Sequence, residues 1–341
     1  MVGETPGFWW TDQKFMRRLL LPVSWIYGYF AKRTLERKNV PTIHLPVLCV
    51  GNFTLGGTGK TPVVISLAKA AKKRGLVPGI ISRGFGGTIT DAHLVNPEID
   101  RARKVGDEPL LLARHAPVAV ATNRLEAAKL LLEQGCNFIL MDDGFQSRRL
   151  FIDYALIVVD GLRGLGNEAV FPAGPLRAPL VTQLAFTDSV LIVGNSNKND
   201  HVIRLAARAA KPLDFAHLLP SVNESAEGKT FLAFAGIGNP QKFFRSIIEL
   251  NGEVKQTRSF PDHHFYSDFD LQDIMTTATA NHLCLATTAK DFARLKTDKQ
   301  DKKLENLFVF DVDVAFDNPD FCQNIIDATL ENFATRCNRI W

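Results

Sequence analysis

The segment Gly51-Asn-Phe-Thr-Leu-Gly-Gly-Thr-Gly-Lys-Thr-Pro62 decides the fold of this 341-residue chain. It follows an apolar run, residues 45–50, that is typical of a buried strand, and it precedes a helical pattern over residues 61–74. A glycine-rich turn between a strand and a helix presents backbone N–H groups that bind phosphate, and the helix N-terminus adds partial positive charge. The segment therefore predicts a phosphate-binding loop, or P-loop.

The glycine pattern of this P-loop is a variant of the common one. The pattern G-x-x-x-x-G-K-[ST] has a glycine at the position of Thr54. We expect Lys60 to reach the terminal phosphates of ATP and the Thr61 hydroxyl to bind Mg²⁺. The predicted nucleotide-binding set is Thr54, Leu55, Gly56, Gly57, Thr58, Gly59, Lys60 and Thr61.

Two adjacent acids, Asp142 and Asp143, end a strongly apolar run that begins at residue 138. The carboxyl ends of parallel strands face the ligand crevice of an α/β sheet, so these acids are predicted Mg²⁺ ligands together with Thr61. Adjacent residues of a strand point to opposite faces, so the two acids are expected to differ in role. The sequence leaves open which of them contacts the metal.

Apolar runs alternate with helical patterns along most of the chain. After the P-loop, strands are predicted at 77–81, 118–121, 137–141, 155–159 and 189–193, and helices at 108–115 and 124–134; a second series has strands at 231–235, 283–287 and 307–310, and helices at 240–250 and 320–333. This alternation predicts a P-loop NTPase-like α/β fold with a mostly parallel sheet flanked by helices. We expect a P-loop domain over residues 41–225 and a second, smaller α/β domain over 226–341; an alternative is that the terminal helix of the second domain packs back on the P-loop domain.

The first 40 residues differ in character from the rest. Seven basic and three acidic residues give them a balance of +4, which equals the net charge of the whole chain. The apolar run 19–31 has 13 residues, whereas a spanning helix needs about 20. Its tryptophans, tyrosines and flanking basic residues favour a helix that lies in the membrane interface, with a buried core helix as the alternative. A cleaved signal peptide does not fit, because no small-residue cleavage site follows the run.

Composition excludes several other classes. Basic residues are concentrated at the N-terminus instead of covering a binding face, so we expect no nucleic-acid partner. The five cysteines are scattered without C-x-x-C spacing, which indicates reduced thiols and neither a disulfide framework nor a zinc site.

Seven blocks of the chain resemble the tetraacyldisaccharide 4'-kinase family, and they occur in the order that is typical of that family. They are residues 51–62, 82–87, 105–109, 142–146, 171–177, 235–240 and 260–264. The resemblance implies transfer of the ATP γ-phosphoryl group to the 4'-hydroxyl of a tetraacylated disaccharide 1-phosphate. The product would be lipid IVA, a precursor of lipid A, made at the cytoplasmic face of the bacterial inner membrane. No obligate protein partner is implied.

The resemblance also implies roles for individual residues. Asp107, assisted by His263, would be the base for the 4'-hydroxyl, and Lys60 would contact the phosphates. Glu108, Gln146, Arg177 and Asp262 would line the substrate site. Asp107 and His263 fall in different predicted domains, so domain closure is a hypothesis for how they meet. Phe85 departs from the family pattern, in which tyrosine is common.

Two other functions remain open at this point. The G-G-x-G-K-T core also occurs in ParA-like ATPases and metallochaperones, which use hydrolysis as a switch; Leu55 stands where these proteins often have a signature lysine. A non-catalytic nucleotide-binding module at the membrane is the other alternative, although the three acids Asp107, Asp142 and Asp143 argue against it.

Overall fold

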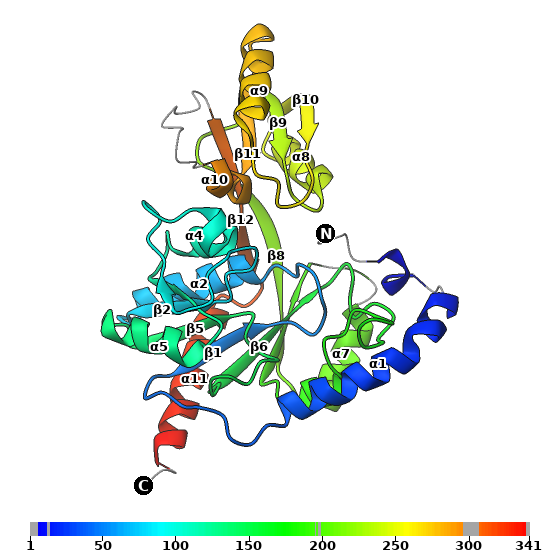
Figure 1. Cartoon of the computed structure of the whole chain (residues 1–341), viewed down its shortest axis with the longest axis vertical. Coiled ribbons are helices and arrows are strands. Elements are labelled where there is room, and N and C mark those ends of the chain that lie inside the picture. Colours follow the sequence, from blue (N-terminus) through cyan, green and yellow to red (C-terminus); the bar gives the residue numbers. More distant parts are fainter. Residues whose placement is uncertain (1–5, 12–13, 195, 197–198, 296–306, 339–341) are drawn as a thin grey trace.

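The computed structural model describes residues 6–11, 14–194, 196, 199–295 and 307–338. Parts of the predicted segments 1–40 and 226–341 therefore lie outside the described residues. Within them, one 12-stranded sheet has the order β10-β9-β11-β12-β8-β7-β6-β1-β5-β2-β4-β3 (Figure 1). All neighbouring strands are parallel except β12–β8 and β3–β4, so the predicted mostly parallel α/β sheet is confirmed.

The larger part of the sheet contains the P-loop. Its strands are β1 Val47–Gly51, β2 Pro78–Ser82, β3 His93–Leu94, β4 Val118–Val120, β5 Phe138–Asp142, β6 Tyr154–Asp160, β7 Ser189–Val193 and β8 Leu213–Val222. Alternate residues of β1 belong to opposite cores: Leu48 and Val50 pack in one cluster, and Val47 and Cys49 pack in the other. Both faces of this sheet are therefore covered, as the continuous apolar strands indicate.

Helices cover both faces of this larger part. They are α2 Lys60–Lys73, α3 Ala102–Val105, α4 Asp107–Leu112, α5 Arg124–Glu133, α6 Leu180–Ala185, α7 Asn199–Arg208 and the terminal helix α11 Phe321–Asn338. Helices α2 and α11 contribute to one core, and α5, α6 and α7 contribute to the other. Helix α11 packs against α2, β1 and β6. The chain therefore returns to the P-loop part after the smaller part is complete.

The smaller part continues the same sheet beyond β8. It contains β9 Thr230–Ala235, β10 Glu253–Ser259, β11 Cys284–Thr288 and β12 Leu307–Phe316, with helices α8 Pro240–Glu249, α9 Asp268–Ala280 and α10 Ala289–Leu295. The antiparallel β8–β12 ladder runs from Val222↔Phe310 to Ala216↔Phe316. It joins the two parts, and Figure 1 shows the smaller part above the P-loop part.

The N-terminal segment forms the short 3₁₀ turn η1 Gly7–Trp9 and the helix α1 Lys14–Leu35. Ser24, on the inner side of α1, accepts a hydrogen bond from the Ala173 backbone N–H at 2.9 Å. The Trp9 indole donates to the Pro172 carbonyl at 3.0 Å. These contacts attach α1 to the segment that precedes α6. In the described ranges, no helix has the length and apolar character needed to cross a membrane.

Candidate active site

The P-loop connects β1 to α2, as the sequence predicts. Gly56 and Gly59 have φ angles of 107° and 83°, a region that favours glycine because other residues are strained there. The Leu55 N–H donates to the Pro175 carbonyl at 2.8 Å, which fixes one end of the loop. Among the described residues, the backbone N–H groups of 56–59 have no acceptor within the protein. The loop therefore offers donors to an anion at the start of α2.

Asp142 lies beside the end of β1, because β1 and β5 pair in parallel with Val50 opposite Asp142. Its side chain is buried, and its Oδ1 atom has no hydrogen-bond partner within the described part of the chain. Burial, together with the negative charge of Glu108 and in spite of nearby Lys60, raises the pKa of Asp142 to about 7. A buried carboxylate oxygen without a partner is a suitable ligand for a cation.

Asp143 has a different environment from its neighbour. Its φ angle of 56° takes the chain out of the strand, and its carboxylate faces Arg177 and Lys60. Arg177 contacts Oδ1 at 2.9 Å, and Lys60 Nζ lies 3.6 Å from the same atom. Burial opposes ionisation of Asp143, but the charges of Lys60 and Arg177 outweigh it and lower the pKa. The two acids therefore differ, as strand alternation led us to expect.

Gln146 lies at the edge of this group. Its Nε2 donates to the Asn52 carbonyl at 2.7 Å and to Gln183 Oε1 at 3.0 Å. Gln183 is fully buried and also donates to the Phe53 carbonyl at 3.3 Å. In this structure Gln146 thus supports the backbone that leads into the P-loop.

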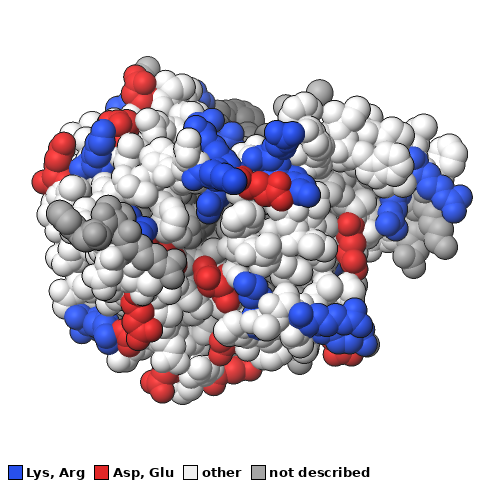
Figure 2. Space-filling model, turned by 90° about the horizontal axis from the view of Figure 1, so that it is seen from below, with Lys and Arg blue, Asp and Glu red and all other residues white. Residues whose placement is uncertain are grey.

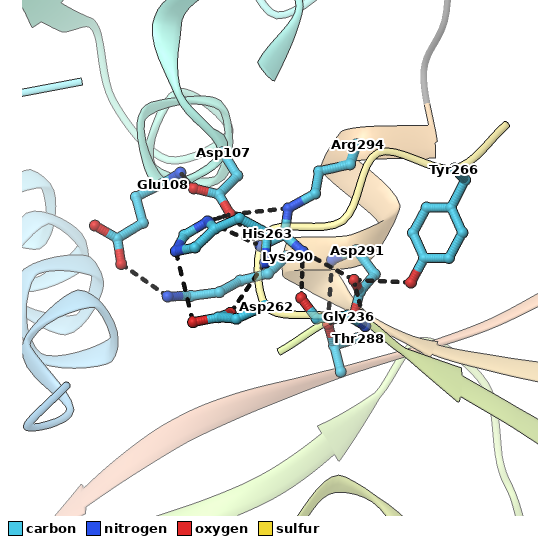
Figure 3. A network of polar contacts seen from close by, with 10 residues as sticks. All are labelled: Asp107, Glu108, Gly236, Asp262, His263, Tyr266, Thr288, Lys290, Asp291 and Arg294. Atoms are coloured by element: carbon cyan, nitrogen blue, oxygen red, sulfur yellow. Dashed lines mark hydrogen bonds and ion pairs between the residues drawn. The ribbon is translucent and has the colours of Figure 1, made fainter. Parts of the chain in front are cut away.

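A second group of predicted residues lies where α4 meets α10 (Figure 3). Asp107 is buried at the start of α4, and its Oδ2 lies 3.3 Å from His263 Nδ1. Arg294 of α10 donates to the same oxygen from Nε at 3.0 Å and also from Nη2. Burial favours the neutral acid, but His263 and Arg294 outweigh it and hold the pKa of Asp107 well below its usual range. The hydrogen bond with Asp107 raises the pKa of His263.

The remaining predicted residues surround this pair. Glu108 Oε1 accepts from Lys290 Nζ at 2.7 Å, and Asp262 Oδ2 lies 3.8 Å from His263 Nε2. The Phe85 ring is tilted against the His263 ring, with centroids 5.9 Å apart. Glu108 and Lys290 also affect the pKa of Asp142, so this group is within electrostatic range of the acids near the P-loop.

The structure therefore brings the predicted residues into two neighbouring groups. Lys60, Asp142, Asp143 and Arg177 form one group, and Asp107, Glu108, Asp262 and His263 form the other. Sequence reasoning missed Lys290, Asp291 and Arg294 as members of the second group. Lys290 and Asp291 closely follow the predicted strand 283–287, and that position was the signal that could have indicated them.

A P-loop lies beside the buried Asp142 and the half-buried Asp143, and a histidine–carboxylate pair is close by. This arrangement defines a P-loop phosphotransferase in which a second group can accept the proton of the acceptor hydroxyl. A family model described as LpxK, tetraacyldisaccharide-1-P 4'-kinase, matches residues 16–331. The chain belongs to this family.

Curated relatives agree with the family model over almost the whole chain. The tetraacyldisaccharide 4'-kinase of Bartonella quintana is 57% identical over 336 residues, which are 98% of this chain and 98% of that protein. The tetraacyldisaccharide 4'-kinase of Brucella ovis is 50% identical over 338 residues, 98% of this chain and 99% of that protein. The resemblance found in the sequence is thus confirmed, and the ParA-like or metallochaperone alternative is not favoured.

A solved structure supports the same fold. The crystal structure of LpxK from Aquifex aeolicus in complex with ATP has a TM-score of 0.74 and 24% identity, covering 92% of this chain and 99% of that chain. At this identity the likeness concerns the fold.

Proposed function

We propose that this protein transfers the γ-phosphoryl group of ATP to the 4'-hydroxyl of tetraacyldisaccharide 1-phosphate, which forms lipid IVA for lipid A biosynthesis. Family membership supports the reaction. The observation in the structure that carries it is the Asp107–His263 pair, within electrostatic range of the P-loop acids. A hydrolytic switch would not need a second proton-accepting group for a sugar hydroxyl.

Magnesium would be held by Asp142 and Thr61 in this proposal. Within the described residues no group of three or more His, Cys, Asp and Glu side chains forms a metal cluster. Mg²⁺ does not require one, because it usually binds one or two carboxylates, water and the phosphates of the nucleotide. The free Oδ1 of buried Asp142 fits this role, whereas Asp143 is occupied by Arg177. The ion would neutralise charge on the phosphates.

The proton of the 4'-hydroxyl would go to His263. Asp107 Oδ2 is an acceptor, so the 3.3 Å contact assigns a proton to His263 Nδ1 and leaves the lone pair of Nε2 available when the ring is neutral. The lowered pKa of Asp107 makes its carboxylate a weak base, whereas the raised pKa of His263 strengthens the ring as a base. This order of roles differs from the sequence-based expectation, in which Asp107 was the base and His263 its assistant.

The remaining predicted residues keep supporting roles in the proposal. Lys60 and the loop residues 54–61 would bind the ATP phosphates, and Arg177 would position Asp143 beside Lys60. Glu108 and Asp262 would line the entrance of the acceptor sugar, since both lie beside the Asp107–His263 pair. Gln146 would act through the backbone of the P-loop.

We further propose that α1 lies on the cytoplasmic surface of the inner membrane, where it meets the lipid substrate. Exposed apolar side chains recur on one face of α1 at helical spacing; they are Phe15, Leu19, Val23, Ile26 and Phe30. Figure 2 shows the molecule from below. The part that projects on the right, on the side where α1 lies in Figure 1, is mainly white, with a few blue basic side chains beside it. An apolar face flanked by basic residues is suited to an anionic membrane surface.

The division predicted from the sequence also remains part of the proposal: residues 1–40, 41–225 and 226–341. Separate cores support it, since one cluster packs around α8 and another around α9 in the smaller part. Helix α11 packs on the P-loop part, which is the alternative stated for the terminal helix.

A phosphate-transfer assay tests the function. Purified protein is mixed with ATP labelled at the γ-phosphate, Mg²⁺ and tetraacyldisaccharide 1-phosphate in mixed micelles. We expect label in the lipid with the wild type, and a loss of about 100-fold or more with Lys60→Ala. ATP hydrolysis without labelled lipid would contradict a kinase and support the switch.

A further inference from the structure

Arg294 is a buried arginine that links the smaller part of the sheet to the base of the reaction. Its side chain is 1% exposed and donates to Asp107 Oδ2 from two nitrogens, Nε at 3.0 Å and Nη2. Nη2 also lies 3.5 Å from His263 Nδ1. The guanidinium thus faces the carboxylate and the imidazole together, as Figure 3 shows.

The guanidinium is itself held from the other side. Nη1 donates to the Gly236 carbonyl at 2.7 Å and to Asp291 Oδ1 at 3.0 Å. Asp291 is fully buried, and its two oxygens accept from the Gly236 N–H at 2.9 Å, the Tyr266 hydroxyl at 2.9 Å and the Thr288 hydroxyl at 2.6 Å. These contacts fix Arg294 on a rigid support that extends from β9 and β11 to α10.

The carboxylate of Asp107 consequently has little freedom to rotate. Its Oδ1 accepts from the Glu108 N–H at 3.0 Å, and its Oδ2 is shared by Arg294 and His263. A carboxylate that is held on both oxygens presents one defined acceptor direction to the histidine. The direction in which His263 Nε2 points therefore depends on where Arg294 holds Asp107.

We propose that Arg294 is a positioning residue for phosphoryl transfer: it fixes the Asp107 carboxylate so that His263 keeps its Nδ1 proton toward Asp107 and its Nε2 toward the acceptor hydroxyl. This inference rests on the proposed function of the Asp107–His263 pair. Support from a buried third group is what holds a catalytic histidine within the narrow geometry that proton transfer requires. Arg294 touches no substrate in this scheme and acts through Asp107.

The charges around the pair determine how the pH dependence should change. Arg294 and Lys290 of α10 face Asp107, and Asp262 and Arg294 face His263. A lysine ammonium cannot reach Asp107 and Asp291 together, so in Arg294→Lys the charge of Asp107 is less neutralised and less positive charge lies beside the ring. Both changes stabilise the imidazolium, so the pKa of His263 rises further and more of the ring is protonated at neutral pH.

Arg294→Lys is the central variant, because it keeps a positive charge but not the fork that spans Asp107 and Asp291. Arg258→Lys is the matched control: Arg258 is a surface residue of β10, with its Nε 3.5 Å from Asp273. For Arg294→Lys we expect kcat to fall about 10- to 100-fold with KM for ATP within about twofold. In a plot of kcat against pH, the midpoint of the acidic limb should shift to higher pH by roughly one unit. The control should match the wild type.

A second measurement does not depend on activity. Titration of His263 by NMR, in protein with labelled histidine, should show a higher pKa in Arg294→Lys than in the wild type. If this variant loses cooperative thermal unfolding, Asp291→Asn takes its role, because it weakens the support of Arg294 but leaves the guanidinium in place. We then expect a smaller fall in kcat and no rise in the pKa of His263, since a negative charge beside the guanidinium is lost.

The outcomes separate the inference from the proposed function. A purely structural role would lower the amount of folded protein without moving the pH limb or the His263 titration, and that result would overturn the inference. A wild-type protein that labels no lipid would overturn the proposed function itself. If Arg294→Lys folds and has the kcat and the acidic pH limb of the wild type, the inference about Arg294 is overturned while the proposed function stands.

Discussion

Arg177 and Asp143 form a two-pronged ion pair, with Nη1 2.9 Å from Oδ1 and Nη2 3.1 Å from Oδ2. The Arg177 Nε also donates to the Thr54 carbonyl at 3.1 Å, and its backbone N–H donates to the Phe53 carbonyl at 2.9 Å. One arginine therefore connects the acid after β5 to the backbone of the P-loop. Asp142, in contrast, keeps a free oxygen.

Replacement of Arg177 by lysine should weaken transfer although the charge is kept. An ammonium cannot contact both oxygens of Asp143 and the Thr54 carbonyl together. We expect kcat/KM for ATP to fall about tenfold or more, measured in the lipid-labelling assay, with a loss of about 1–3 kcal/mol in unfolding free energy from the unpaired groups. Arg258→Lys again serves as the surface control. If Arg177→Lys kept the kcat/KM of the wild type, the two-pronged ion pair between Arg177 and Asp143 would have no role in the reaction.

The two adjacent acids should respond differently to amide substitution. Asp142→Asn removes the proposed Mg²⁺ ligand and should reduce transfer by at least about 100-fold, with much weaker dependence on Mg²⁺ concentration. Asp143→Asn should retain the Mg²⁺ dependence and lose activity mainly by releasing Lys60 and Arg177. Isothermal titration of Mg²⁺ into protein with a nonhydrolysable ATP analogue compares them directly. Equal Mg²⁺ affinity in the two variants would contradict the assignment of Asp142.

Asp107→Asn should destabilise the protein at neutral pH by about 3 kcal/mol, because it removes one of the two carboxylates that pair with buried Arg294. The folded-state pKa of Asp107 is lowered, so the stability contributed by its charge is present above the pKa of an unfolded aspartate, about 4. This contribution is lost as the pH falls below that value.

The gap in unfolding free energy between wild type and Asp107→Asn should therefore narrow between pH 5 and pH 3, as measured by urea unfolding. Asp273→Asn is the control, because Asp273 belongs to an exposed ion pair. Its unfolding free energy should differ only slightly from that of the wild type at every pH. A gap that stays constant over this pH range would show that the charge of Asp107 does not stabilise the fold.

The double substitution Ile26→Glu with Phe30→Glu should reduce binding to vesicles that contain anionic lipid. Both side chains are exposed on the apolar face of α1, at 63% and 64%. Carboxylates at these positions cannot enter the interface and are repelled by anionic headgroups. Vesicle flotation should show a loss of about tenfold or more, whereas Phe269→Glu, at an exposed site on α9, should bind as the wild type does. Equal binding by the double variant would indicate another membrane contact.

Much of the P-loop part could be predicted from the sequence because its strands are continuous and apolar. Ser189–Val193 was predicted with the observed bounds, and the predicted run 137–141 differs by one residue from β5 Phe138–Asp142. Buried parallel strands carry apolar residues on both faces, which makes them visible as unbroken runs. The P-loop was visible for a similar reason, since glycine spacing identifies it locally.

Elements without such local signals were missed. β10 has the sequence Glu-Val-Lys-Gln-Thr-Arg-Ser and lies at the edge of the sheet, where polar residues are tolerated. β8 is only partly buried and contains Pro220. Helix α10 has seven residues, too few for a periodic pattern, so Arg294 gave no sign of its role. Its approach to Asp107, 187 positions earlier, is a tertiary contact that no local pattern encodes.

The antiparallel junction between β8 and β12 limits how the two parts of the protein can move. The ladder pairs seven residues of each strand, and Pro220 faces Val312 within it without an N–H to donate. A ribbon of two long strands bends and twists more readily than it shears, because shear would break every rung at once. We therefore expect the P-loop part and the smaller part to move relative to each other by bending and twisting of the β8–β12 ladder, and not by free rotation about a flexible linker.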